Sequence, residues 1–364
     1  MIDCKIYSKS FPYHLWQVLA GFSMLHQQRI IKLSFVESNE LLPHLMFRVS
    51  INQTSVIFDL NDGYDDFREA HSDYVDFYNN LLSSCSFLFK RSFSALINSE
   101  FKESSKVRPL CLYYKTTLKG CESHKFNFNI DLKSNIVTQV RRIPIKSNEK
   151  SFASLDYRNF ELAPKHSEQP KILFLARMWE PNLKNENPNM QAHSDLKNEE
   201  RHIINETRAK LIITCRHEFG SNFIGGVSND AYSAKKYKQL VASSKITNKF
   251  NYMKIVKNSD ICIANMGLHS SNGGKLPEYV AASKCIVTEK LHYEAPGEFV
   301  KNKNYLEYES VDKCIENINF LIENPDVRYQ MMLNNFKYYN DYLRPDRIVL
   351  EVLFTTLNVT NLNF

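Results

Sequence analysis

The sequence lacks most of the features that would place a protein in a class at first sight. Only 10 of its 364 residues are glycine and only 2 are tryptophan. No apolar run reaches the roughly 18 residues needed to cross a bilayer. Residues 1–16 have no basic patch followed by an apolar core, unlike a secretory signal. We therefore expect a cytoplasmic protein.

Several motifs of common enzyme classes are missing as well. The chain has no G-x-G-x-x-G and no G-x-x-x-x-G-K-[ST], which disfavours a dehydrogenase and a P-loop NTPase. It has no cluster of His and Cys at metal-ligand spacing. The eight cysteines form no C-x-x-C pair and several lie in apolar runs, which indicates buried thiols. We expect neither a metal nor a cofactor.

The excess of positive charge is mild, with a formal net charge of +6. It suits an anionic ligand, or peripheral contact with the anionic inner face of a membrane. For basic clusters such as 140–146 and 235–240, a solvated surface is the simpler explanation. Binding to nucleic acid would require a stronger basic stripe, so we expect none.

The length is comfortable for two domains, and the pattern of the second half predicts an α/β fold. Short apolar runs alternate there with helical stretches, as in a buried parallel sheet. The expected strands are 171–176, 210–215, 260–265, 284–289 and 304–308. The expected helices are 198–209, 233–244, 275–283 and 310–324, the last with Ser310 as N-cap and Pro325 as stop.

The first half has the same pattern with weaker contrast. Its expected elements are strands at 4–8, 30–36, 46–51, 55–60, 85–90 and 110–114, and a helix at 12–27. Residues 144–170 are polar and without clear period, which is typical of a crossover between domains. We predict an N-terminal domain at 1–155, a second domain at 156–335, and a helical tail at 336–364 that packs back towards the first domain.

The stretch "GLHSSNGGKLPEYVAASKCIVTE" (267–289) is the most informative one. A strand, a loop of small residues with Gly273 and Gly274, and a helix N-terminus together form an anion site. Lys275 adds a charge, and Glu278 lies three residues further on the same helical face. This pattern fits phosphate plus sugar, that is, a nucleotide. A plain turn from strand to helix explains the spacing equally well.

The segment 259–310 resembles the donor-binding half of GT-B glycosyltransferases, in the family-1-like group that includes CgeB-type proteins and many capsule and lipopolysaccharide transferases. The shared features are a basic residue three before a glutamate, the small residues "AAS", an acidic Pro-Gly loop, "NYLEYES" and "NPDVR". The resemblance runs from about 171 to 350. It implies a GT-B architecture, with two Rossmann-like domains whose parallel sheets face a central cleft.

The resemblance also implies roles for residues of the second half. Glu278 matches the glutamate that holds the donor ribose, and Lys275 and Arg177 match basic residues beside the donor diphosphate. Retaining members often have a second glutamate eight positions earlier, where this chain has Ser270. His269 or Ser270 would then contact the donor sugar, and retention or inversion stays open.

The implied reaction moves a sugar from a nucleotide-sugar donor to a glycan or lipid-linked acceptor, in the synthesis of cell-surface polysaccharide or lipopolysaccharide. Positive charge and N–H groups stabilise the leaving phosphate. An inverting enzyme also needs a base. Asp62 is our first candidate and His14 the second, although turn formation explains any single aspartate among Asp59, Asp62, Asp65 and Asp66. The chain has no Asp-x-Asp of the metal-dependent transferases.

Two other functions remain open from the sequence. A catalytically inactive binding or scaffold protein on the same frame would explain the missing glutamate. A nucleotide-sugar epimerase on a similar frame would convert the donor without an acceptor. The sequence names neither the donor sugar, nor its base, nor the acceptor.

Overall fold

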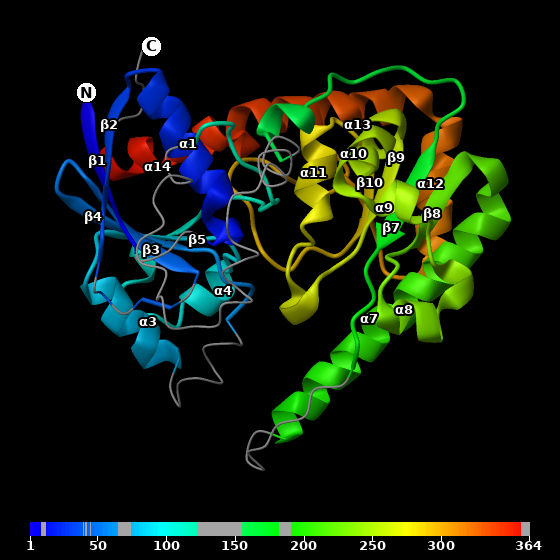
Figure 1. Ribbon diagram of the computed structural model, residues 1–364, viewed down its shortest axis with the longest axis horizontal. Coiled ribbons are helices and arrows are strands. Elements are labelled where there is room, and N and C mark those ends of the chain that lie inside the picture. The colour runs from blue at the N-terminus through cyan, green and yellow to red at the C-terminus, as the bar shows by residue number, and fades with distance from the viewer. Residues whose placement is uncertain are drawn as a thin grey trace, which may run out of the picture. The chain divides into compact units, whose positions relative to one another are not determined.

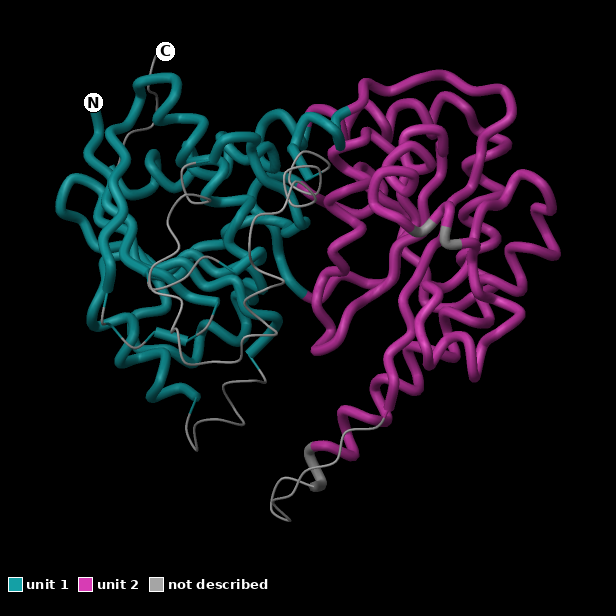
Figure 2. Tube along the Cα trace, in the orientation of Figure 1, with its two compact units in different colours: residues 1–161, 293–298, 338–364 teal, residues 162–292, 299–337 magenta. Residues whose placement is uncertain are grey.

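The computed structural model describes residues 1–8, 12–38, 40, 42–43, 45–64, 74–121, 155–181 and 191–357. The chain divides into two compact units (Figure 2). Unit 1 comprises Met1–Glu161, Tyr293–Glu298 and Tyr338–Phe364, and unit 2 comprises Leu162–His292 and Phe299–Lys337. Each unit holds one β-sheet with helices packed on it. The predicted fold class, α/β with two Rossmann-like domains, is confirmed.

Unit 1 contains a six-stranded sheet with the order β2-β1-β3-β4-β5-β6. Its strands are β1 (Ile2–Tyr7), β2 (Ile31–Val36), β3 (Met46–Ile51), β4 (Thr54–Asp59), β5 (Phe87–Lys90) and β6 (Val107–Pro109). Strand β3 runs antiparallel to both neighbours, so this sheet is mixed and not wholly parallel as predicted. Only Asn52 and Gln53 join β3 to β4, both with positive φ, and a two-residue hairpin requires antiparallel strands.

The helices of unit 1 come from both ends of the chain. Helix α14 near the C-terminus packs with α1 into the same hydrophobic core (Figure 1). The helical elements are η1 (Tyr13–Leu15), α1 (Trp16–Gln27), α3 (Tyr74–Ser83), α4 (Ala95–Asn98), η2 (Ser104–Lys106), η4 (Tyr157–Asn159), the π-helical turn η9 (Tyr339–Leu343) and α14 (Pro345–Leu357).

Unit 2 contains a five-stranded, wholly parallel sheet with the order β11-β10-β9-β7-β8. Its strands are β7 (Ile172–Ala176), β8 (Phe223–Val227), β9 (Ile261–Ala264), β10 (Cys285–Glu289) and β11 (Leu306–Tyr308). The chain runs from β7 to β8 on one side and then to β9 on the other. The order therefore reverses between β7 and β9, and the carboxyl ends of such strands are where ligands bind in open α/β sheets.

The helical elements of unit 2 cover its sheet. They are α7 (Gln191–Phe219), η6 (Gly220–Asn222), α8 (Ala231–Lys236), η7 (Lys238–Leu240), α9 (Ser244–Thr247), α10 (Lys249–Asn258), η8 (Leu268–Ser270), α11 (Lys275–Ala281), α12 (Val311–Glu323) and α13 (Pro325–Tyr338). The predicted cap of α12 is confirmed, because the Ser310 side chain accepts a hydrogen bond from Lys313 N at 3.1 Å.

Three predictions of secondary structure in the second half are wrong. Residues 210–215 continue helix α7, because Leu211, Ile212 and Cys215 face the core from one helical side. The second strand of unit 2 is instead β8, which contains two glycines and was not predicted. The predicted helix 233–244 ends at Lys236, and α10 precedes β9 instead.

The first half differs at one predicted strand. Residues 110–114 form no strand, and the last strand of the sheet is β6, which ends directly before them at Pro109. All eight cysteines are buried free thiols, as predicted. Among the described residues, no helix is long and apolar enough to cross a membrane.

Candidate functional site

Three cationic side chains meet at the carboxyl end of β7. Arg177 follows the strand directly, and its exposed guanidinium lies 4.4 Å from the centroid of the Trp179 ring. Arg208 of α7 donates to the Arg177 carbonyl, and Lys275 of α11 donates to the Leu175 carbonyl. The first and last of these cations were predicted from the sequence. The structure brings them to the same strand end and adds Arg208.

Helix α7 holds the two loops at this strand end. Asn205 is fully buried and pairs with the Trp179 backbone, accepting from N at 2.8 Å and donating to O at 2.6 Å. Arg208, one helical turn later and 6% exposed, also donates to Met266 O at 2.9 Å. With the Asn265 amide oxygen turned towards it, Arg208 Nε donates to that oxygen at 2.6 Å. The loops after β7 and β9 are therefore fixed to one helix.

The predicted paired glycines differ in what they do. A Cβ on Gly273 would lie 2.6 Å from Asn265 O, so glycine is required for the loop to pass this carbonyl. Gly274 is exposed and has an ordinary helical φ of −61°, which any residue can adopt. The first glycine therefore has a structural reason that is independent of any ligand.

Lys275 lies within the structure rather than at the mouth of the loop. Its Nζ lies 5.1 Å from the centroid of the Tyr252 ring and also donates the hydrogen bond to the Leu175 carbonyl of β7. Burial lowers the pKa of Lys275 to about 8, and the neighbouring Arg208 and Lys249 act in the same direction against Glu278. A nearby anion would stabilise its charged form.

The carboxylate of Glu278 already has a partner in unit 2. It is 7% exposed and forms an ion pair with Lys249 of α10. Because it is buried and paired with α10, its contact with a ribose stays a prediction.

His269 and Ser270 occupy a strained turn after β9. Both have positive φ, 58° and 53°, which is unusual for non-glycine residues and clusters at functional sites. The His269 N–H donates to the Glu200 carboxylate of α7 at 2.7 Å. Ser270 and Glu200 also line a cavity of about 320 Å³ beside the turn. A carboxylate thus already occupies one backbone donor of this loop.

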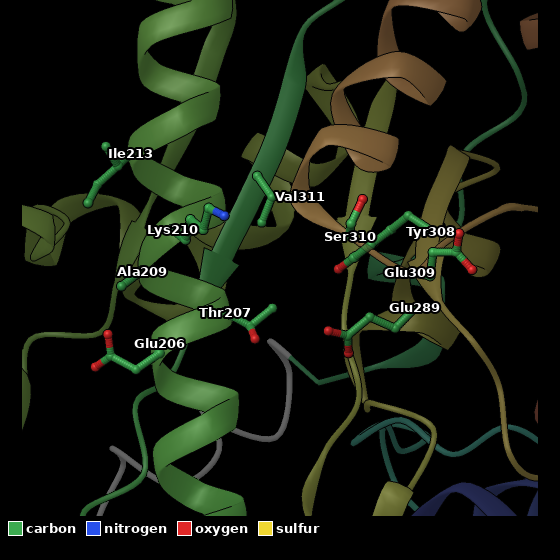
Figure 3. Close-up of a pocket in the computed structure, with 10 residues that line it drawn as sticks. All are labelled: Glu206, Thr207, Ala209, Lys210, Ile213, Glu289, Tyr308, Glu309, Ser310 and Val311. Carbon is green, nitrogen blue, oxygen red and sulfur yellow. The ribbon is translucent and has the colours of Figure 1, made fainter.

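Glu289 ends β10 and links the loop after β9 to a larger cavity. Its carboxylate accepts from Met266 N at 2.7 Å, and burial raises its pKa against this hydrogen bond and against Arg208. The cavity has a volume of about 620 Å³ and lies between α7 and the ends of β10 and β11. Figure 3 shows Glu289 directed across this space towards Thr207.

A buried ion pair in unit 1 holds the loop that carries Asp62, the predicted base. Asp59 and Lys90 end the adjacent strands β4 and β5, are both 0% exposed, and pair at 2.7 Å. The Tyr78 hydroxyl donates to the same carboxylate at 3.0 Å, and Asn61 donates to it through N and Nδ2 at 2.9 Å. Lys90 also donates to Gly63 O at 3.0 Å. The pair therefore fixes both ends of the short loop that carries Asp62.

The two predicted base candidates belong to one cluster of side chains. Asp62 pairs with Arg91 at 2.8 Å, and the Arg91 guanidinium lies 4.7 Å from the centroid of the Tyr113 ring. The half-buried His14 ring lies 5.9 Å from Tyr113 and 3.9 Å from Tyr13. These residues lie beyond the carboxyl ends of β1, β4, β5 and β6. The other two candidate aspartates, at 65 and 66, lie outside the described residues.

Several residues of these clusters escaped the sequence analysis. Asn205 and Arg208 are polar at i and i+3 of a helix whose other buried residues, Ser194 apart, are apolar, which is a signal that could have found them. Lys90 ends an apolar strand, as Asp59 does, so their pairing could also have been inferred. Glu289 offers no such signal, because an acid after a strand is common.

Metal ligands do not gather in the part of the chain that the structure describes. There, no three His, Cys, Asp or Glu side chains lie as they would around an ion.

The comparisons with known proteins find similarity in structure alone. No family model and no curated protein matches the sequence. Anabaena HepE in complex with UDP and glucose has a TM-score of 0.43 and 11% identity, covering 97% of this chain and 98% of that one. A putative UDP-N-acetylglucosamine 2-epimerase from Listeria monocytogenes has a TM-score of 0.41 and 8% identity, covering 98% and 96%. A glycosyltransferase from Rickettsia africae has a TM-score of 0.42 and 12% identity, covering 79% and 68%. These similarities assign neither an activity nor a substrate to this chain.

Proposed function

We propose that the protein is a glycosyltransferase that moves a sugar from a nucleotide-sugar donor to a glycan or lipid-linked acceptor without a metal. The observation that carries the proposal is the convergence of Arg177, Arg208 and Lys275 at the carboxyl end of β7. Arg177 and Arg208 repel each other, as do Arg208 and Lys275, and an anion bound nearby reduces that cost. A diphosphate at the reversal of strand order fits this charge and this place.

The donor would bind to unit 2 through its diphosphate. Arg177 is the exposed cation and makes direct contact, while the indole Nε1 of Trp179, which has no acceptor among the described residues, is a further donor. As the bond between the anomeric carbon and the phosphate oxygen breaks, negative charge grows on the leaving diphosphate. Cations already in place stabilise that charge without reorganisation.

The acceptor hydroxyl would lose its proton to a base in unit 1. Asp62 is about two-fifths exposed and forms an ion pair with Arg91, so its carboxylate is held in place and still accessible. The base takes the proton, the acceptor oxygen forms the new glycosidic bond, and the nucleoside diphosphate leaves. His14 is the alternative base in the same cluster.

The test is an acceptor-dependence assay with a panel of nucleotide sugars. The parent is expected to release nucleoside diphosphate at a substantial rate only when a glycan acceptor is present, and EDTA is expected to leave that rate unchanged. Arg177→Ala is expected to weaken donor binding at least tenfold. Arg216→Ala on α7, where the arginine is exposed and donates to Gln239 O at 2.8 Å, is the matched control.

Other outcomes separate the remaining functions. If the sugar of the donor is converted without an acceptor, the protein is an epimerase and not a transferase. Tight binding of a donor with neither transfer nor conversion would favour a binding protein. Asp62→Asn is expected to abolish transfer and to leave donor binding unchanged, and equal transfer by this variant and the parent would remove Asp62 as the base.

A further inference from the structure

We infer that Arg208 is a positioning residue whose buried positive charge draws a nucleoside diphosphate to the carboxyl ends of β7 and β9, and that Glu289 weakens this attraction as an internal counter-charge. The inference rests on the proposed function. It adds two residues that were not selected from the sequence and that no similarity singles out.

The geometry of Arg208 explains why it can act on both loops at once. Its guanidinium donates to Arg177 O after β7 and to Met266 O after β9, with Asn265 at the remaining side. Planar guanidinium groups hold several acceptors in fixed directions. All of these partners are neutral, so each hydrogen bond orders a loop without cancelling the positive charge.

The charge of Arg208 lacks a close counter-ion. Among the described residues no carboxylate lies within 4 Å of it, although only 6% of the residue is exposed. Burial lowers its pKa to about 10, against the more distant attraction of Glu289. A buried charge that is hydrogen-bonded but not paired is stabilised by any anion that reaches it.

Glu289 is the carboxylate whose charge acts on Arg208. It accepts from the N–H of Met266, while Arg208 donates to the carbonyl of the same residue. One peptide segment therefore lies between two opposite charges, the buried Arg208 and the half-buried Glu289. The other side of Glu289 faces the cavity of about 620 Å³ (Figure 3), so water there screens its charge and leaves part of the Arg208 field uncancelled.

The opposite signs of the two charges give a sharp test. Kd is measured by calorimetry for whichever of UDP, GDP, ADP and TDP binds the parent most tightly, at about 0.1 M and 1 M salt. One charge about 10 Å away at an effective dielectric constant of ~20 changes affinity about tenfold. Arg208→Gln is expected to weaken binding by about this factor, and Glu289→Gln, which keeps an acceptor for Met266, to tighten it.

The salt dependence of Kd separates an effect of charge from an effect of altered structure. At 1 M salt the Debye length falls to about 3 Å, so the difference in affinity between Glu289→Gln and the parent is expected to be smaller than at 0.1 M salt. Arg216→Gln, on the exposed side of α7, is expected to change neither value. If Arg208→Gln does not fold, Glu289→Gln carries the test alone, because it removes charge and keeps the hydrogen bond.

The outcomes distinguish this inference from the function on which it rests. A parent that binds none of the four nucleotides overturns both. A parent that binds, together with a Glu289→Gln variant of equal or weaker affinity at low salt, overturns the inference and leaves the proposed function standing.

Discussion

The buried ion pair of unit 1 makes a quantitative prediction about stability. Lys90 and Asp59 are both 0% exposed and 2.7 Å apart, so Lys90→Met leaves a buried carboxylate without its counter-ion. Removing one partner of a buried pair costs about 3–5 kcal/mol. The Tyr78 and Asn61 donors remain, which favours the lower end of this range. The double variant Lys90→Met, Asp59→Asn is expected to lose less free energy of unfolding than the sum of the two single variants, because it leaves no unpaired charge.

The pH dependence of the stability of Asp59→Asn is a second test of the same ion pair. Burial lowers the pKa of Lys90 and Asp59 opposes this, so removing Asp59 lowers the pKa further. The unfolded chain then binds more protons than the folded one between the two pKa values, and stability rises with pH. The defect of Asp59→Asn is therefore expected to shrink from pH 7 to pH 9.5.

Guanidinium unfolding followed by far-UV circular dichroism measures these changes, with the first transition compared among variants. Lys5→Met is the matched control, since Lys5 is 47% exposed and lies 3.7 Å from Asp3. Exposed pairs contribute about 0–1 kcal/mol, so this variant is expected to match the parent closely. A loss below about 1 kcal/mol for Lys90→Met would show that the pair is not an essential support of this loop.

Three further predictions concern unit 2. Because the pKa of Lys275 is about 8, the affinity for a nucleoside diphosphate is expected to fall as pH rises from 7 to 9.5. Lys275→Met is expected to abolish this trend in calorimetry. An unchanged trend would show that another group titrates. Gly273→Ala, whose Cβ would lie 2.6 Å from a carbonyl oxygen, is expected to lower the free energy of unfolding by about 1–3 kcal/mol. Gly274→Ala is expected to change it very little, because this residue has an ordinary helical φ. Equal losses in thermal unfolding would contradict the geometry. Ser310→Ala removes the cap of α12 and is expected to cost about 1 kcal/mol, with Ser310→Asp restoring it; no loss would mean that the cap is dispensable.

Local pattern was enough to predict most strands of the parallel sheet. Strands β7, β9 and β10 are short apolar runs that are buried on both faces, so their composition alone identifies them. The same rule failed at 210–215, where an apolar run lies on one face of a long helix. It also missed β8, because Gly225 and Gly226 weaken the apolar signal of a strand.

Part of the candidate site followed from sequence too. Arg177 and Lys275 were selected because they flank a strand end and a small-residue loop, and both contribute to the cation cluster. Pattern could not say that Lys275 turns inward to β7, or that the Glu278 carboxylate pairs with Lys249, because these contacts join segments far apart in the chain.

The sequence by itself determined that the protein has an α/β fold, where most of its strands lie, and which loop carries glycine and charge. These are local properties, set by the apolar period and by the backbone freedom of individual residues. Only the tertiary structure decided that Arg208 and Glu289 hold opposite ends of one peptide segment, and that Asp59 pairs with Lys90. Such pairs depend on which elements the fold brings together, since the energy of a buried charge is set by neighbours distant in sequence.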